Sequence, residues 1–138
     1  MIIDWNLCEK EFIRIVKRDE RRVKSIIDRA LIRLKIVEEI KINDEGISFI
    51  VEGYYEVIKE LLVAYLLKNG LRSKNHQCLI SYFYKTTRKE KETNLISQMS
   101  YFRNRLGYYG EIIPKKFYET NRKEFKDIIK LLLGMLKA

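Results

Sequence analysis

Residues 101–110 gather side chains that can bind a phosphate group and stack on a nucleobase. Guanidinium and amide groups donate hydrogen bonds to phosphate oxygens, and tyrosine rings offer flat faces for stacking. The segment contains five candidates for binding a nucleic acid or a nucleotide: Arg103, Asn104, Arg105, Tyr108 and Tyr109. The candidates for a catalytic role within this set are Arg103, Asn104 and Tyr108.

An apolar pattern predicts that this segment closes a helix over about residues 92–108. Five residues recur at spacings of four and three, as in one buried helical stripe: Leu95, Met99, Phe102, Leu106 and Tyr109. Arg103, Asn104 and Tyr108 lie beside that stripe, so we expect their side chains to reach solvent or a partner.

The rest of the chain is expected to be helical almost throughout, since it has one proline, six glycines and no low-complexity tract. Further helices are predicted over about residues 7–18, 19–40, 46–69 and 74–84, and from Pro114 onward. Residues 85–91 are expected to be an exposed loop, and Ser73 to cap the helix that follows it. The expected architecture is an all-α, antiparallel bundle of about five to six helices, in a single domain over residues 1–138.

The helix over residues 46–69 is expected to lie at the centre of the bundle. It is apolar on nearly every side across residues 61–67, and such a helix must lie between neighbours. Gly53 is expected to let another helix pack closely against it. Gly70 is expected to end the helix, because glycine adopts the left-handed conformation at low cost.

The charge of the chain favours an anionic partner. Lys and Arg outnumber Asp and Glu by 28 to 19, for a formal net charge of +9, which favours nucleic acid over a membrane surface. The alternative is a basic protein with no such partner. The cations of residues 14–22 are interpreted either as a solvated face or as a patch that follows a phosphate backbone.

Several classes of protein are excluded by composition and motifs. Cys8 and Cys78 are too few for a disulfide framework or a zinc site, so we expect two small buried hydrophobic residues in a cytoplasmic protein. The longest apolar run, residues 61–67, is too short to span a membrane, and the N-terminus lacks the pattern of a signal peptide. With one histidine and no glycine-rich phosphate loop, neither a metal nor a cofactor is expected.

Two stretches of this chain resemble the central helical hairpin of HEPN domains. They are residues 53–66, Gly-Tyr-Tyr-Glu-Val-Ile-Lys-Glu-Leu-Leu-Val-Ala-Tyr-Leu, and residues 69–76, Asn-Gly-Leu-Arg-Ser-Lys-Asn-His. Arg103 and Asn104 fall where such domains carry an Arg-polar-x-x-x-His signature, and the resemblance covers about residues 23–135. HEPN domains are small helical bundles, first described as nucleotide-binding and including many RNases. The resemblance implies a homodimer in which the signature residues of two subunits face each other.

One residue departs from the HEPN signature. Tyr108 occupies the position of the histidine, which in the active RNases is thought to assist proton transfer from the ribose 2′-OH. Tyrosine keeps its proton at neutral pH and is a poor general base there, so weak or absent metal-independent RNase activity is expected. His76 is the alternative source of an imidazole, although we interpret it first as a capping or surface residue.

Three functional hypotheses remain open from the sequence. The first is an RNA- or nucleotide-binding HEPN-like protein of RNA processing, toxin–antitoxin or defence type. The second is a non-catalytic interaction module that partners a minimal nucleotidyltransferase, as some HEPN proteins do. The third is a binder of small nucleotides without turnover.

Overall fold

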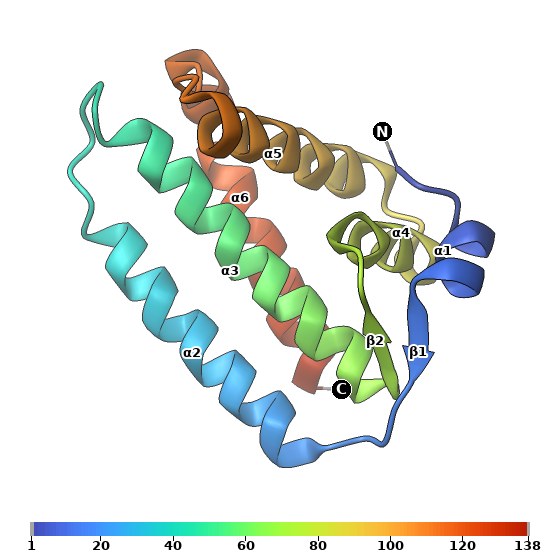
Figure 1. Cartoon of the computed structure of the whole chain (residues 1–138). Coiled ribbons are helices and arrows are strands. Elements are labelled where there is room, and N and C mark those ends of the chain that lie inside the picture. Colours follow the sequence, from blue (N-terminus) through green and yellow to red (C-terminus); the bar gives the residue numbers. More distant parts are fainter. Residues whose placement is uncertain (1, 138) are drawn as a thin grey trace.

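The fold is an all-α bundle, as predicted, in a computed structural model that describes residues 2–137. Within these residues the chain forms six helices and two short strands (Figure 1): α1 (Trp5–Glu11), β1 (Ile13–Ile15), α2 (Glu20–Glu38), α3 (Ile47–Lys68), β2 (Leu71–Ser73), α4 (His76–Thr87), α5 (Glu90–Tyr109) and α6 (Lys115–Lys137).

Helix α3 is the centre of the bundle, which confirms the prediction made from its apolar sequence. It packs against α2, α4, α5 and α6 (Figure 1) and against β2. Thirteen of its residues are buried, whereas Phe49 and Val63 on the remaining side are exposed. A largely apolar helix loses contact with water only when neighbours cover its faces, and the four helices around α3 cover all but this side.

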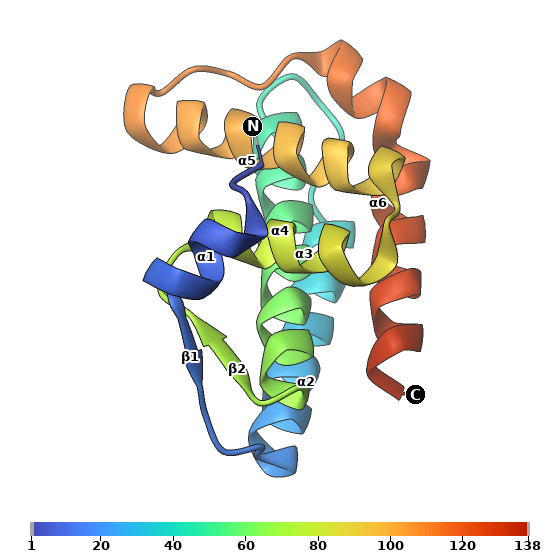
Figure 2. The same ribbon diagram turned by 90° about the vertical axis from the view of Figure 1, so that its right-hand side faces the viewer.

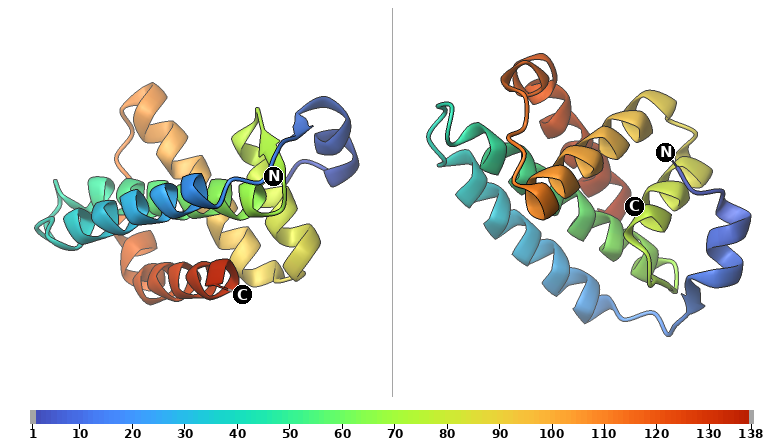
Figure 3. Two further views of the ribbon diagram at one scale, coloured as in Figure 1. Left: turned by 90° about the horizontal axis from the view of Figure 1, so that it is seen from below. Right: turned by 45° about the horizontal axis from the view of Figure 1, so that its top comes forward.

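Helices α2 and α3 run antiparallel, side by side (Figure 3), and they approach each other closely at Gly53. A Cβ atom built on Gly53 would lie 2.4 Å from Cγ2 of Val37 in α2, which is far inside van der Waals contact. The absence of a side chain at Gly53 therefore sets how near α2 lies to the central helix, as the sequence predicted.

The prediction of a helix over residues 7–18 is wrong in its second half. Helix α1 ends at Glu11, and β1 pairs antiparallel with β2, with Arg14 opposite Arg72. The pairing continues through the backbone N–H of Val16, which donates to the carbonyl oxygen of Gly70 at 2.9 Å. Ile13 and Ile15 are β-branched and alternate along the chain, so they fit a strand once a partner strand is available.

The ends of α3 and α4 are set by local backbone geometry. Gly70 has φ of +74° directly after α3, as predicted. Helix α4 begins later than expected because Asn75, and not Ser73, caps it: the Asn75 side chain accepts a 2.8 Å hydrogen bond from the backbone N–H of Gln77. The predicted loop over residues 85–91 is wrong, because Arg88 turns the chain in a left-handed conformation and only two residues separate α4 from α5.

The two cysteines are buried, as predicted, but they are bonded to each other. Cys8 in α1 and Cys78 in α4 form a disulfide between positions 70 residues apart, with Cα atoms separated by 5.6 Å. The expectation of two unpaired hydrophobic residues is therefore wrong. Spacing along the chain carried no sign of this pair, because only the packing of α1 on α4 brings the sulfur atoms together.

Helix α5 crosses the bundle and projects beyond α3 at its C-terminal end (Figure 2). Leu95 and Met99 of the predicted stripe are buried and Phe102 and Leu106 are partly buried, whereas Tyr109 is 68% exposed. The stripe was expected to be buried along its whole length, and it is not, because α3 does not extend under the last turn of α5. The backbone N–H of Ile113 then donates to Oγ of Ser48 at 2.9 Å, which fixes the approach to α6.

Helix α6 covers α3 with a regular apolar face. Tyr118, Phe125, Ile128 and Leu132 are buried as predicted, and Met135 is partly buried. Pro114 lies immediately before the helix, where its missing N–H does no harm. No helix within residues 2–137 has the length and apolar character needed to cross a lipid bilayer.

Candidate anion-binding groove

A groove of about 460 Å³ lies beside α5, and we refer to it as the α5 groove. It brings together three of the candidate site residues with three basic side chains from other parts of the chain: Arg103, Asn104, Tyr108, Lys59, Lys74 and His76. Phe12, Tyr55, Asn75, Gln77 and Ser100 complete its lining. The α5 groove therefore concentrates cationic and hydrogen-bonding groups in one concave surface.

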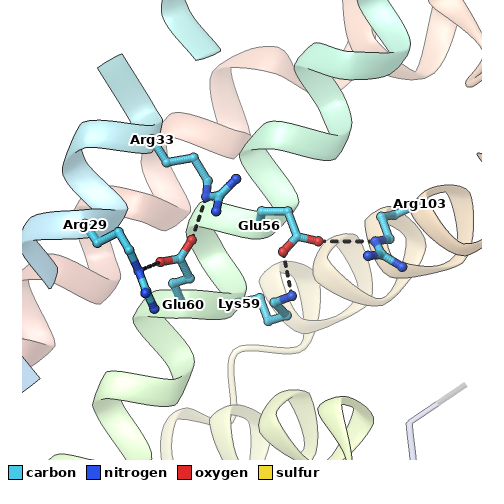
Figure 4. Close-up of polar contacts among 6 residues, drawn as sticks. All are labelled: Arg29, Arg33, Glu56, Lys59, Glu60 and Arg103. Atoms are coloured by element: carbon cyan, nitrogen blue, oxygen red, sulfur yellow. Dashed lines mark hydrogen bonds and ion pairs between the residues drawn. The ribbon is translucent and has the colours of Figure 1, made fainter. Parts of the chain in front are cut away.

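One carboxylate holds the two cations of the groove that come from helices α3 and α5 (Figure 4). Nε of Arg103 donates to Oε1 of Glu56 at 3.2 Å, and Nζ of Lys59 lies 2.5 Å from the other oxygen, Oε2. A single negative charge shared by two positive charges leaves the cluster with a net positive charge. The remaining guanidinium donors of Arg103 can still bind an anion, because Glu56 engages only Nε.

The Glu56 carboxyl is ionised at neutral pH. Burial raises its pKa, but the hydrogen bond and charge of Lys59, together with Arg103, outweigh burial and hold the pKa below the ordinary value. This balance keeps Glu56 as a permanent anchor for both cations. It also means that these cations are pre-positioned before any ligand arrives.

A hydrogen bond between two lining residues of the groove ties α4 to α5. Nε2 of Gln77 donates to Oγ of Ser100 at 2.9 Å. Tyr55, on the α3 side of the groove, has a raised pKa, because burial outweighs the opposing hydrogen bond from Ser100. Its phenol therefore stays neutral and donates or accepts hydrogen bonds without adding charge.

His76 is exposed, as expected for a surface residue, and it is the first residue of α4. It also lines the α5 groove together with Arg103, a neighbour that sequence reasoning did not predict. Its pKa is lowered, first by burial and then by the positive charge of Lys59, with Glu56 acting in the opposite direction. No sequence signal linked His76 to Arg103, because the fold of α4 against α5 makes them neighbours.

Two further candidates lie at the open side of the groove. The Asn104 side chain is half-buried and has no hydrogen-bond partner among residues 2–137, so its amide is available to a ligand. Tyr108 is 74% exposed at the rim. The predicted trio of Arg103, Asn104 and Tyr108 is thus brought together in one place.

The other two candidates, Arg105 and Tyr109, lie outside the α5 groove. Nε of Arg105 donates to Oε2 of Glu111 at 2.8 Å, and its guanidinium stacks 4.6 Å from the ring centre of Tyr109. Arg105 is therefore already engaged by a carboxylate and a ring. The five residues proposed from the sequence separate into three that share a groove and two that pair with each other.

A second basic groove adjoins the first along α2. It measures about 760 Å³ and shares Lys59 with the α5 groove. Its cations Arg29 and Arg33 contact opposite oxygens of Glu60, at 3.2 Å and 2.6 Å (Figure 4). Of the basic cluster over residues 14–22, only Arg22 lines this second groove, because the cluster is distributed over β1, the connecting segment and α2.

No group of three or more potential metal-ligating side chains occurs within residues 2–137. Comparison of the chain with known protein families, curated proteins and solved structures gave no match.

Proposed function

We propose that this protein binds single-stranded RNA or a nucleotide, with a phosphate group seated in the α5 groove. The observation that carries the proposal is the convergence of Lys59, Lys74 and Arg103 on one groove beside a single carboxylate, Glu56. Cations that are already fixed in position bind a phosphate with little loss of side-chain freedom. Asn104 adds a hydrogen-bonding amide, and Tyr108 adds a ring at the rim on which a base can stack.

The resemblance to HEPN domains supports the same assignment and extends it to RNA processing, toxin–antitoxin or defence functions. Within that proposal the Arg103-Asn104-x-x-x-Tyr108 site is a degenerate form of the HEPN signature, because Tyr108 stands at the position of the histidine. A phenol replaces the imidazole of the signature and is a poorer general base, so metal-independent cleavage of RNA by this site is weak or absent. The proposed role is binding, and endoribonuclease activity is at most residual.

A cytoplasmic location remains part of the proposal. The buried bond between Cys8 and Cys78 is unusual for that compartment in organisms that grow at moderate temperature. Intracellular proteins of hyperthermophiles are rich in disulfides, however, and in surface ion-pair networks. Charged residues make up 34% of this chain, which fits a heat-adapted cytoplasmic protein.

The proposal is tested by measuring how tightly the protein binds a labelled single-stranded RNA across a range of salt concentrations. Phosphate contacts release counterions, so affinity should fall steeply as salt rises, by a slope of about 0.7 per contacted phosphate on a double-logarithmic plot. Arg103→Ala should weaken binding about tenfold and reduce that slope by about 0.7.

The matched control is Arg122→Ala. Arg122 is an exposed arginine of α6 that makes no ion pair within residues 2–137, and its loss removes the same charge from outside both grooves. An organised site is supported if Arg103→Ala weakens RNA binding about tenfold and Arg122→Ala changes it little. Equal effects of the two variants, or no binding at low salt, would contradict the proposal.

The alternative function is a non-catalytic module that partners a minimal nucleotidyltransferase. The observation that favours it is the exposed apolar surface at the end of α5 and just beyond: Tyr101, Tyr108, Tyr109 and Ile112. Large exposed apolar patches mark interaction surfaces. A nucleotidyltransferase gene beside this one, and a stable complex of the two purified products, would favour the alternative over RNA binding.

A further inference from the structure

We propose that the α5 groove selects a terminal phosphomonoester, on an RNA end or a mononucleotide, over an internal phosphodiester, and that His76 takes up a proton when this phosphate binds. The inference rests on the proposed function and specifies the ligand class of the same groove. Four observations on the groove support it: its net charge, the position of His76, the groups around His76, and the rings that line the cavity.

The charge of the groove matches a phosphomonoester better than a phosphodiester. Lys59, Lys74 and Arg103 carry three positive charges, and Glu56 carries one negative charge. The difference, 3 − 1, is a net charge of about +2 while His76 is neutral. A phosphodiester carries one negative charge, whereas a monoester carries between about 1.5 and 2 at neutral pH. The monoester therefore neutralises the groove more fully.

A phosphate bound in the α5 groove would neutralise the net positive charge around His76. Burial and the nearby charges of Lys59 and Arg103 lower its pKa in the free protein, with Glu56 opposing them. A dianion that neutralises Lys59 and Arg103 removes the repulsion and adds attraction, which favours the imidazolium form. The imidazole then becomes a further cationic donor to the phosphate.

Charged groups surround His76 on two sides. On the α5-groove side they come from α3, α5 and the residue before the cap of α4: Glu56, Lys59, Arg103 and Lys74. His76 also borders a neighbouring cavity between α2, α3 and β2, whose charged lining residues are Lys17, Asp19, Arg22 and Arg72. Cations outnumber anions on both sides, so the surroundings of His76 favour its neutral form until an anion enters the groove.

Aromatic side chains line the same groove as the cations. Phe12 and Tyr108 come from different parts of the chain, and their rings can pack against a terminal ribose or base, whereas Tyr55 is buried in the wall of the groove. A strand end fits such a site with its phosphate among the cations and its last base against a ring. The strand would continue past Lys59 into the second groove along α2.

The proton uptake is tested by NMR, because His76 is the only histidine of the chain and its imidazole signals need no assignment. The pKa of His76 is measured in the free protein and with saturating oligouridylate that carries a 5′-phosphate, a 3′-phosphate or neither. We expect a pKa below the ordinary value in the free protein and a clear rise with one of the two phosphorylated strands. The unphosphorylated strand should produce a smaller rise.

Affinities of the same three strands test the selectivity. At pH 6.5 we expect the preferred phosphorylated strand to bind about tenfold more tightly than the unphosphorylated strand, the size of one additional charge-assisted contact. The ratio should fall toward one in His76→Gln, which keeps a hydrogen-bonding side chain but cannot gain a proton. Arg122→Ala, outside the groove, should keep the native ratio.

The ratio should also fall as pH rises from 6.5 to 8. Binding takes up a proton at pH values between the lowered pKa of free His76 and the raised pKa of His76 in the complex. Affinity for the phosphorylated strand therefore increases as pH falls within that range. Equal affinity for all three strands, or an unchanged His76 pKa in a saturated complex, would overturn this inference and leave RNA binding standing. Failure of the native protein to bind any of the three strands would overturn the proposed function itself.

Discussion

At the scale of single residues, Glu56 has two opposed effects on the α5 groove. Its carboxylate fixes Arg103 and Lys59 in place, at 3.2 Å and 2.5 Å, and so stabilises the contact between α3 and α5. The same carboxylate repels an incoming phosphate and lowers the positive charge that the phosphate meets. A group of this kind is expected to contribute to stability at the expense of affinity.

The variant Glu56→Gln separates the two effects. We expect it to lose about 1–2 kcal/mol of unfolding free energy at pH 7, as for a charged hydrogen-bonded group that is partly buried, and to bind RNA several-fold more tightly. Urea denaturation and RNA titration measure the two quantities. Glu119→Gln, at an exposed position of α6, is the control and should change neither.

The stability difference between native protein and Glu56→Gln should depend on pH. The pKa of Glu56 is lowered in the folded protein, so the unfolded state binds the proton first as pH falls. The contribution of Glu56 to the unfolding free energy is therefore fully present above the ordinary carboxyl pKa. It is lost as pH falls through the lowered pKa that Glu56 has in the folded protein. A difference that persists unchanged at pH 2–3 would contradict the assignment of Glu56 as the charged anchor.

Tyr108 provides the test of catalysis at the residue scale. We expect little cleavage of RNA by the native protein in the presence of a chelator, and at least a tenfold increase for Tyr108→His, since a general acid–base group contributes about 10²–10⁴-fold. Tyr109→His is the control, because Tyr109 is similarly exposed but does not line the α5 groove. Strong native cleavage that Arg103→Ala abolishes would show that no added histidine is needed.

At the scale of elements, the contact between α2 and α3 positions one wall of the second basic groove. Val37 of α2 lies against the backbone of α3 at Gly53, and the cations Arg29 and Arg33 come from the same face of α2 that contacts Glu60. Any increase in the separation of α2 and α3 would therefore move these cations relative to Lys59.

The variant Gly53→Ala tests this close approach. A new Cβ would lie 2.4 Å from Cγ2 of Val37, so we expect a loss of about 1–3 kcal/mol in unfolding free energy from overpacking. The loss should shrink in a Val37→Ala background, where room is made for the new methyl group. Chemical denaturation of the four proteins in this double-mutant cycle measures the coupling.

The control for Gly53→Ala is Gly134→Ala in α6. No atom lies within 4 Å of a Cβ at Gly134, so this substitution should stabilise the protein by about 0.5–1 kcal/mol through helix propensity. Equal effects of the two substitutions would mean that the approach of α2 to Gly53 is looser than described.

At the scale of the whole molecule, we predict a homodimer that forms through the projecting end of α5. The HEPN resemblance led to this prediction, and Tyr109 and Ile112 are 68% and 76% exposed there. Light scattering at micromolar concentrations should give twice the monomer mass, and Ile112→Asp should shift the protein toward monomer. Ile32→Asp, at an exposed site on α2, is the control, and a monomer mass for the native protein would count against the prediction.

The sequence by itself determined the features that depend on local pattern and backbone chemistry. An uninterrupted apolar run identified α3 as the centre, Gly70 ended it, and Gly53 marked the close approach of α2. The helical class and the grouping of Asn104 with Tyr108 on one side of α5 follow from the same periodicity, because residues four apart lie on one face of a helix.

Only the tertiary structure decided which distant residues meet. His76 joins Arg103 in one groove, Cys8 bonds to Cys78, and β1 forms where a helix was expected, each through contacts between elements far apart in the chain. Arg105 pairs with Glu111 and lies outside the α5 groove because the chain turns back after α5. Such contacts depend on how whole elements pack, and periodicity within one element carries no information about its partner.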